Sequence, residues 1–214
     1  MPLRAVIFDL WNTIAEWPHE RWAQVRPEIA QHFGLSPEEF DSRWYGRELA
    51  HLRETRPFAD VLALFDLAPE VAEEVVSLRR EVTRQGLVPV PGAAETIAEL
   101  RERGYKLGLI TVCSEDVPLL WPEMAFHGLF DAEVFSATCG LRKPDPRIYQ
   151  LALNELRVVA EEAVFVGDGA NDELAGAERV GMRAVGVESP GGELPEAWDG
   201  LRIQTLPELL SMLP

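Results

Sequence analysis

The sequence predicts an α/β fold with a parallel β-sheet and a helical segment inserted after the first strand. Short apolar runs that are bounded by turn residues and separated by helical patterns are typical of buried parallel strands. Such runs lie at residues 3–9, 106–111, 163–168 and 183–187, and a weaker one lies at 202–204. Between the first two runs, residues 20–85 contain helical patterns and no convincing strand. The fold is therefore expected to combine a sheet with a separate helical unit.

Two chain crossings, near residues 15–19 and 85–91, would join this unit to the sheet. Both contain proline or glycine, as linkers often do. We therefore expect a core domain made of residues 1–15 and 87–214 and a helical cap made of residues 16–86. A cap hinged over a crevice is a common way to exclude water during chemistry.

Capping residues predict where several helices begin. Ser36 is an expected N-cap, with Pro37 at the first helical position and Glu39 completing a capping box. Other helix breaks or starts in the cap are expected at Pro27, Pro57 and Pro69.

In the core, helices are expected over residues 92–103, 145–156 and 207–213. The second of these has Asp145 as its expected N-cap, followed by Pro146.

Composition excludes several classes of partner. The 214 residues have a formal net charge of −16, whereas nucleic acid and anionic membrane surfaces attract basic proteins. No apolar run approaches the ~20 residues of a membrane span, and we expect no secretory leader before the first strand. Cys113 and Cys139 lack the spacing of a metal site and fit a reducing compartment. We predict a cytoplasmic monomer or homodimer that acts on a small molecule.

Three of the predicted strands end on a side chain that can handle a phosphate or a metal ion. Asp9, Thr111 and Asp168 each follow an apolar run directly. Ligands of parallel sheets bind at the carboxyl ends of the strands, so these side chains are expected to line one crevice. A carboxylate there can act as a nucleophile, and a hydroxyl can donate to a phosphoryl oxygen. Each residue alone also fits a bland role, because aspartate is common in turns and threonine in strands.

Lys143 and Asn12 are further candidates. The chain contains only two lysines, Lys106 and Lys143, among 20 basic residues. Lysine is a compact point charge, so a site that needs one cation against both a carboxylate and a phosphoryl group would favour it over arginine. A lysine in an exposed loop is the alternative. Asn12 tolerates a left-handed backbone and suits a tight turn after Asp9, where we expect it to contact substrate.

The stretch from Gly167 to Asp172 contains two carboxylates, Asp168 and Asp172, in a glycine-containing turn. Carboxylates in one turn suit Mg²⁺, a hard ion that prefers oxygen ligands. A strand-to-helix turn with aspartates as caps would have the same composition.

Together these features resemble the haloacid dehalogenase-like hydrolase superfamily. Its four motifs are Asp-x-Asp-x-Thr, a strand that ends in Thr or Ser, a downstream Lys, and Gly-Asp-x-x-x-Asp. Here they are matched, in order, by Asp9 with Thr13, Thr111, Lys143, and Gly167-Asp168 with Asp172. The resemblance implies a Rossmann-like core with a small helical cap. It also implies a phosphatase reaction on a small phosphorylated metabolite.

The resemblance also assigns roles. Asp9 would become transiently phosphorylated, and Thr111 and Lys143 would hold the phosphoryl oxygens. Mg²⁺ would be held by Asp9, the backbone carbonyl of Trp11 and Asp168, with Asp172 binding the ion or orienting its waters.

Trp11 departs from the family pattern, because phosphatases of the family have an aspartate there as general acid and base. Indole has no useful pKa for that role. The enzyme would then use a good leaving group or borrow an acid from the cap, where the candidates are Glu16, His19, His32 and His51. Two alternatives stay open: a 2-haloacid dehalogenase, since halide needs no proton, and a weak phospho-ligand binder. The retained Gly167-Asp168 pair argues against the dehalogenase, because the resemblance implies that dehalogenases of the family work without metal and have Ser and Asn in place of this pair.

Overall fold

The computed structural model describes residues 1–189, 192, 194–195 and 198–213. Within them, six parallel strands form one sheet in the order β3-β2-β1-β4-β5-β6. The strands are β1 (Ala5–Phe8), β2 (Lys106–Thr111), β3 (Ala132–Phe135), β4 (Ala163–Gly167), β5 (Arg183–Val187) and β6 (Leu201–Ile203). The sheet confirms the predicted α/β class. The sequence-based prediction missed β3, a run of four residues that contains a glutamate.

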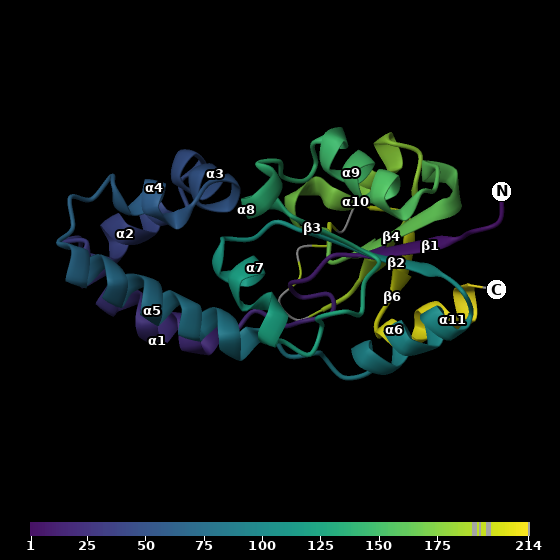
Figure 1. Cartoon of the computed structure of the whole chain (residues 1–214), viewed down its shortest axis with the longest axis horizontal. Coiled ribbons are helices and arrows are strands. Elements are labelled where there is room, and N and C mark those ends of the chain that lie inside the picture. Colours follow the sequence, from purple (N-terminus) through teal and green to yellow (C-terminus); the bar gives the residue numbers. More distant parts are fainter. Residues whose placement is uncertain (190–191, 193, 196–197, 214) are drawn as a thin grey trace.

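Strand β1 lies in the middle of the sheet because all of its side chains are apolar and buried. Val6 and Phe8 pack into the core on one face, and Ala5 and Ile7 into the core on the other. Helices α6 (Ala93–Glu102) and α11 (Leu209–Met212) cover the first face, and helices α9 (Pro146–Leu156) and α10 (Glu173–Arg179) cover the second (Figure 1). This three-layer arrangement is Rossmann-like.

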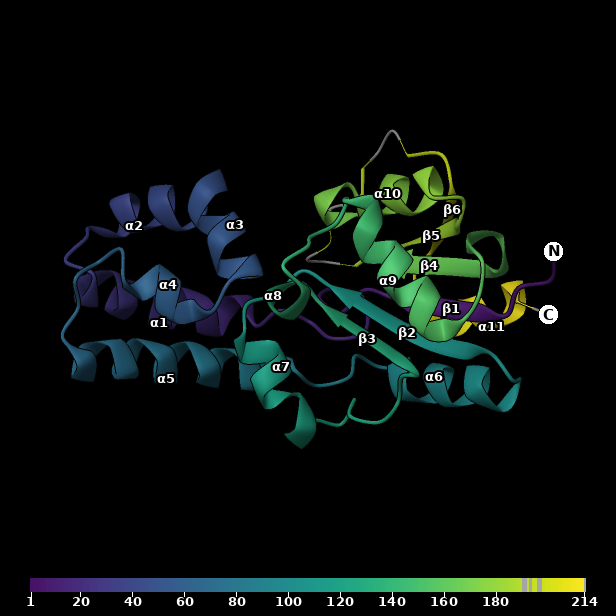
Figure 2. The same ribbon diagram turned by 45° about the horizontal axis from the view of Figure 1, so that its top comes forward.

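Five helices between β1 and α6 lie together beyond one end of the sheet, away from the chain termini (Figures 1 and 2). They are α1 (His19–His32), α2 (Pro37–Trp44), α3 (Arg47–Thr55), α4 (Phe58–Leu62) and α5 (Pro69–Gly86). They enclose a hydrophobic cluster of their own, centred on the stacked rings of Phe40 and Trp44. We refer to these five helices as the helical cap. The exact domain boundaries remain a prediction.

The two segments that connect the cap to the sheet lie side by side. The Val90 amide donates to the Ile14 carbonyl at 2.9 Å, and Ala15 forms an antiparallel bridge with Pro89. Two further helices of the core contact the cap: α7 (Asp116–Leu120) contacts α5, and α8 (Ser136–Cys139) contacts α3. No helix in the described part of the chain is long and apolar enough to cross a membrane.

Most helix boundaries follow the capping signals. The capping box is confirmed, since Ser36 Oγ accepts from the Glu39 amide at 3.2 Å and the Glu39 carboxylate accepts from the Ser36 amide at 3.0 Å. The expectation that Pro27 breaks or starts a helix is wrong, because it lies inside α1. Val25 and Ile29, on either side of it, are buried in the cap cluster, and this packing outweighs one lost backbone hydrogen bond.

Candidate active site

Parallel pairing brings the ends of β1, β2 and β4 to one edge of the sheet. Phe8 is paired with Leu109 on one side and with Val166 on the other. Asp9 follows Phe8 directly, and Asp168 follows Gly167 at the end of β4, so the two aspartates lie next to each other. Both are buried, and carboxylate oxygens of Asp9, Asp168 and Glu173 lie within 4.8 Å of one another.

Lys143 enters this cluster from the loop before α9. Its side chain is buried, and its Nζ forms ion pairs with Asp9 and Glu173 and donates to the Ile110 carbonyl at 3.2 Å. The helix after it begins as predicted, with the Asp145 side chain accepting from the Arg147 amide at 2.9 Å. An exposed loop position for Lys143 is thereby excluded.

The charges of the cluster do not balance. Burial alone would lower the pKa of Lys143, but its contacts with Asp9 and Glu173 outweigh burial and raise it. Burial raises the pKa of Asp9, the Lys143 charge opposes this rise, and the Asp168 charge adds to it. Burial and the Asp9 charge raise the pKa of Glu173 well above its usual value. Three carboxylates around one ammonium form a site that a divalent cation would stabilise.

Glu173, which the sequence analysis did not select, occupies the place expected for Asp172. The Asp172 side chain is exposed and pairs with Arg179 at 2.9 Å, outside the cluster. Asn171 and Asp172 both have left-handed backbone, with φ of 56° and 54°. This turn points the side chain of the next residue inward. Spacing alone could not choose between two adjacent acids.

Both carboxylate oxygens of Glu173 are used. One contacts Lys143, and the other accepts from the Gly169 amide at 3.1 Å. Gly167 makes room for it, since a Cβ at this position would lie 2.0 Å from Glu173 Oε1. Glu173 is therefore placed to orient Lys143, and it also belongs to the group of carboxylates that could hold a metal ion.

Thr111 and Asn12 flank the carboxylates. Thr111 is fully buried, and its Oγ1 has no hydrogen-bond partner among the described residues. A buried hydroxyl at a strand end without a partner is a suitable donor for a ligand oxygen. Asn12 has the expected left-handed backbone, with φ of 56°, and its amide donates to Asp168 Oδ2 at 3.4 Å. Thr13 donates to Asp9 Oδ2, also at 3.4 Å.

Trp11 faces the cap instead of offering an acid. Its ring meets the Trp17 ring edge-on, with centroids 5.1 Å apart. It also lies against the end of α5, where a Cβ on Gly86 would be 3.0 Å from the indole. The indole therefore packs at the junction of the sheet and the cap.

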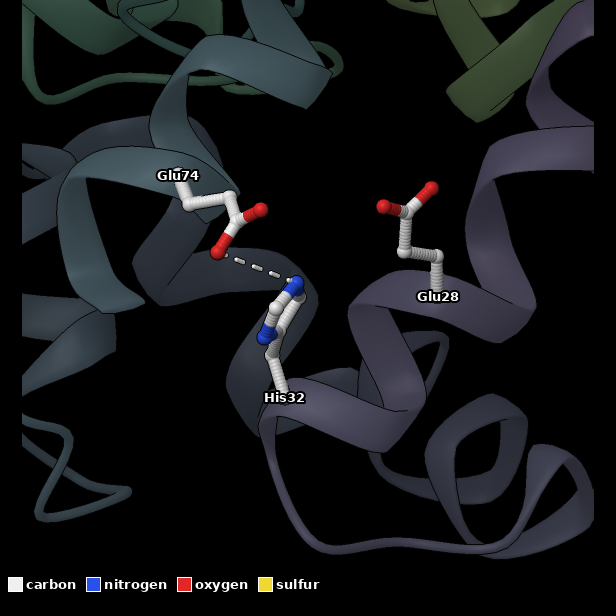
Figure 3. Close-up of side chains that lie close together, drawn as sticks. All are labelled: Glu28, His32 and Glu74. Carbon is white, nitrogen blue, oxygen red and sulfur yellow. Dashed lines mark ion pairs between the residues drawn. The ribbon is translucent and has the colours of Figure 1, made fainter. Parts of the chain in front are cut away.

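The cap residues considered as replacement acids are not brought to Asp9 by any contact found among the described residues. Glu16, His19 and His51 are exposed. His32 lies next to Glu74 at 3.6 Å, with Glu28 nearby, on the surface where α1 faces α5 (Figure 3). This second acidic group lies outside the strand-end cluster, and its two glutamates are exposed.

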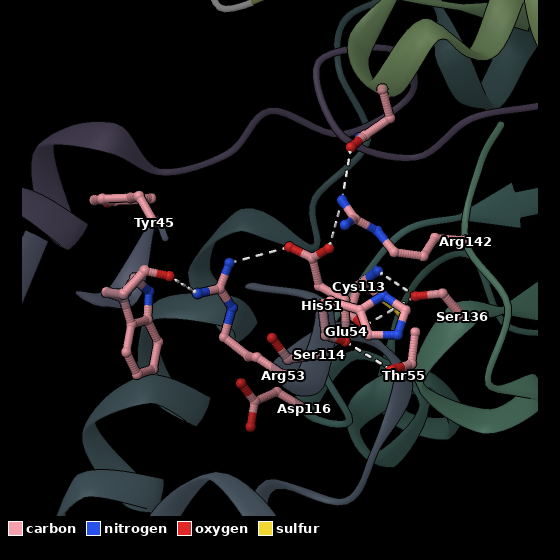
Figure 4. A network of polar contacts seen from close by, with 12 residues as sticks. Tyr45, His51, Arg53, Glu54, Thr55, Cys113, Ser114, Asp116, Ser136 and Arg142 are labelled. Carbon is pink, nitrogen blue, oxygen red and sulfur yellow. Dashed lines mark hydrogen bonds and ion pairs between the residues drawn. The ribbon is translucent and has the colours of Figure 1, made fainter. Parts of the chain in front are cut away.

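A polar network joins the cap to the core beside the cluster (Figure 4). Glu54 on α3 pairs with Arg53 at 3.0 Å and with Arg142 at 2.9 Å. Arg142 also donates to Asn171 at 2.9 Å, in the turn after Asp168. The cap is thus tied to the loops that carry Lys143 and Asp168.

Cys113 is not a nucleophile in this arrangement. It is buried, burial raises the pKa of its thiol to about 12, and its amide donates to Ser136 Oγ at 2.9 Å. Ser114 accepts a hydrogen bond from Arg79 at 3.0 Å.

Known proteins resemble the chain over most of its length. A family model for haloacid dehalogenase-like hydrolases matches residues 3–181. Phosphatase MT3486 of Mycobacterium tuberculosis (strain CDC 1551 / Oshkosh) is 32% identical over 203 residues, covering 89% of this chain and 90% of that protein. Two solved structures each share 25% sequence identity. A HAD phosphatase from Thermococcus onnurineus has a TM-score of 0.76 and covers 98% of this chain and 97% of its own. For a 2-haloacid dehalogenase from Pseudomonas syringae pv. Tomato DC3000, the TM-score is 0.70 and the match covers 98% of this chain and 99% of the other.

Proposed function

Because this chain belongs to the haloacid dehalogenase-like hydrolases, we propose that it is a magnesium-dependent phosphatase acting on a small phosphorylated metabolite. The observation that supports this most is the meeting of Asp9, Asp168 and Lys143 beside the unpartnered hydroxyl of Thr111. The site offers a nucleophile, one cation and one free donor among buried side chains. That set is suited to an anionic tetrahedral group.

Asp9 is the proposed nucleophile. One of its carboxylate oxygens attacks phosphorus, the bond from phosphorus to the leaving oxygen breaks, and that oxygen departs with the electron pair. Lys143, Thr111 and the Asn12 amide donate to phosphoryl oxygens. Water then attacks phosphorus and the Asp9–phosphate bond breaks, which returns the carboxylate and inorganic phosphate, while the proton of water passes to solvent or to the departed oxygen.

Mg²⁺ fits the donor set, because Asp9 and Asp168 offer hard oxygen ligands and the cluster has excess negative charge. Asp9, Asp168 and the backbone carbonyl of Trp11 would hold it. When bound, the ion neutralises charge as two anions approach each other. We do not extend the set to Asp172, whose carboxylate pairs with Arg179; Glu173 instead holds Lys143 in place.

Trp11 restricts the leaving group. A positioned general acid typically contributes about 10²- to 10⁴-fold, and indole cannot supply one. Substrates whose leaving oxygen departs without protonation, such as acyl and aryl phosphates, are therefore favoured over alkyl phosphates. An aromatic residue at this position also suits the alternative, a 2-haloacid dehalogenase, but the Asp168 carboxylate is unnecessary for expelling halide.

The test is the release of phosphate and of halide from one substrate panel, with Mg²⁺ and with EDTA. We expect phosphate release from acetyl phosphate that requires Mg²⁺ and returns when Mg²⁺ is restored. Halide release from 2-chloropropionate in EDTA would overturn the phosphatase proposal in favour of the dehalogenase. Phosphate binding without any turnover would support a catalytically weak binding protein.

A further inference from the structure

A pocket of about 190 Å³ lies between the cap and the core, next to the proposed phosphate site. On the side of the core, it is lined by Trp11 and the segment 112–114. Trp11 lies two residues after Asp9, and residue 112 directly follows Thr111. A phosphoryl group held at these two strand ends would therefore direct the rest of its molecule into this pocket.

The cap wall of the pocket is aromatic. It includes Trp17, Trp22, Trp44 and Tyr45. The rings form a connected series, with centroid distances of 5.1 Å from Trp11 to Trp17, 6.3 Å from Trp17 to Trp22 and 5.9 Å from Trp22 to Trp44. Walls of this kind favour a flat ring, which gains edge-to-face or offset-stacked contacts beyond simple burial.

The charged groups of the pocket are already paired. Arg53 contacts Glu54 at 3.0 Å, and Arg79 contacts Asp116 at 2.9 Å. Burial lowers the pKa of Arg53 to about 10, so it still carries its charge at neutral pH. A second anionic group on the substrate would find no unpaired cation among the described residues that line this pocket, which favours a neutral occupant. One donor is left over, because the Nε of the buried Arg79 has no partner in the described part of the chain.

The size of the pocket sets the size of its occupant. A cavity of about 150 Å³ can hold benzene, so this pocket has room for one six-membered ring with a small substituent. An aryl oxygen is also a leaving group that needs little protonation, which matches the lack of an acid at Trp11. Pocket shape and leaving-group chemistry thus point independently to the same class of molecule.

We infer that this pocket binds the leaving group of the substrate and that this group is a single uncharged aromatic ring, so that the substrate is a monoaryl phosphate. The inference rests on the proposed phosphatase function, since that function places the phosphoryl group at Asp9. The aromatic pocket itself does not depend on turnover, and its occupancy can be measured separately.

The first experiment measures binding of non-hydrolysable phosphonates by calorimetry with Mg²⁺ present. We expect phenylphosphonate to bind at least about tenfold more tightly than methylphosphonate, and more tightly than cyclohexylphosphonate. Equal affinities for the phenyl and methyl compounds would overturn the ring pocket and leave the phosphatase proposal standing. Equal affinities for the phenyl and cyclohexyl compounds would overturn the aromatic preference.

The second experiment titrates phenol alone and follows tryptophan fluorescence, which needs no phosphate site. A saturable change supports the pocket even if neither phosphonate binds, in which case the phosphatase proposal fails by itself. Absence of a saturable change overturns the pocket.

Two variants test whether the preference for phenylphosphonate arises in this pocket. Thr83 and Trp17 both line the pocket. Thr83→Phe would fill it and Trp17→Ala would remove one ring, so both should reduce the preference for phenylphosphonate to less than about threefold. Phe65→Ala removes a half-buried cap ring that stacks on Phe33 instead, 4.2 Å away, and should keep the preference. Loss of the preference in Phe65→Ala but not in Trp17→Ala would contradict the assignment.

Discussion

The two walls of the crevice are built on different principles. The core wall consists of buried charged groups, with Asp9 and Asp168 following strand ends and Lys143 in the loop before α9. The cap wall consists of aromatic rings and of guanidinium groups that are already paired, such as Arg79 with Asp116. The core wall is suited to one reaction at one anionic group, whereas the cap wall is suited to selecting the molecule that carries it. Variants on the two walls should therefore change different measurements.

Among substitutions on the core wall, replacement of Asp9 should reduce turnover most. Asp9→Asn keeps the shape of the side chain but removes the nucleophile and a charged ligand, so we expect turnover to fall at least about 10⁴-fold. The measurement is steady-state phosphate release with Mg²⁺. Asp172→Asn is the matched control, because its carboxylate is exposed and paired with Arg179, and it should change turnover less than about threefold. Similar losses of turnover in both variants would indicate that Asp172 does belong to the metal site.

Loss of a buried ion pair at the junction of the two walls should lower the stability of the protein. Arg79 and Asp116 form a buried pair between α5 and α7, and Arg79→Met leaves the Asp116 charge buried without its partner. We expect this change to lower the free energy of unfolding by about 3–5 kcal/mol. Arg84 also lies on α5 but forms an exposed pair with Glu123, so Arg84→Met should lower the free energy of unfolding by only about 0–1 kcal/mol. Urea denaturation compares the two, and equal losses would mean that burial of the pair is unimportant.

Lys143 tests whether the core wall needs a compact charge. Its Nζ has oxygen atoms of Asp9, Glu173 and Ile110 around it in a buried site, and a longer planar group would displace them. We expect Lys143→Arg to lower kcat/KM about 10²-fold, nearly as much as Lys143→Ala.

Lys106→Arg is the control for this change, because Lys106 Nζ donates to the Leu156 carbonyl at 2.5 Å in a half-buried site away from the cluster. Near-normal kinetics for Lys143→Arg would show that any cation suffices at the core wall.

The difference between the walls also explains what the sequence could predict. Asp9, Thr111 and Asp168 were predictable as neighbours because parallel strands end at one edge, so strand prediction alone places them. Lys143 was predictable from its rarity among many arginines. Glu173 was not, because the left-handed turn at Asn171 and Asp172 decides which of two adjacent acids points inward.

The cap wall was beyond such reasoning. Trp22, Trp44 and Arg79 come from three separate helices, and their meeting depends on how these helices pack. A helical pattern shows that a tryptophan is apolar but does not show whether it lines a pocket or fills a core. Here Trp22 and Trp44 do both, since they are buried in the cap cluster and also border the pocket.

Trp11 lies where the two walls meet, two residues after Asp9 and against Trp17 of the cap segment. Substituting it tests whether the two walls have separate roles. Wild-type enzyme should hydrolyse aryl phosphates better than alkyl phosphates, and Trp11→Asp should raise the alkyl-to-aryl ratio of kcat/KM by about tenfold. The new carboxyl group can protonate an alkoxide, and loss of the indole also opens the aromatic pocket. Trp11→Asn separates these effects, because it opens the pocket equally but cannot donate a proton at neutral pH.

Removal of a packed tryptophan can cost about 3–5 kcal/mol, so both variants must first be shown to be folded by circular dichroism and thermal melting. The Asp variant should then rescue alkyl phosphates by raising kcat, whereas both variants should weaken aryl binding through KM. If the Asn variant raises the ratio as much as the Asp variant, Trp11 acts only through the ring pocket and the reaction needs no acid at this position. If neither variant changes the ratio, the cap wall does not select the leaving group, and the division of labour between the two walls is wrong.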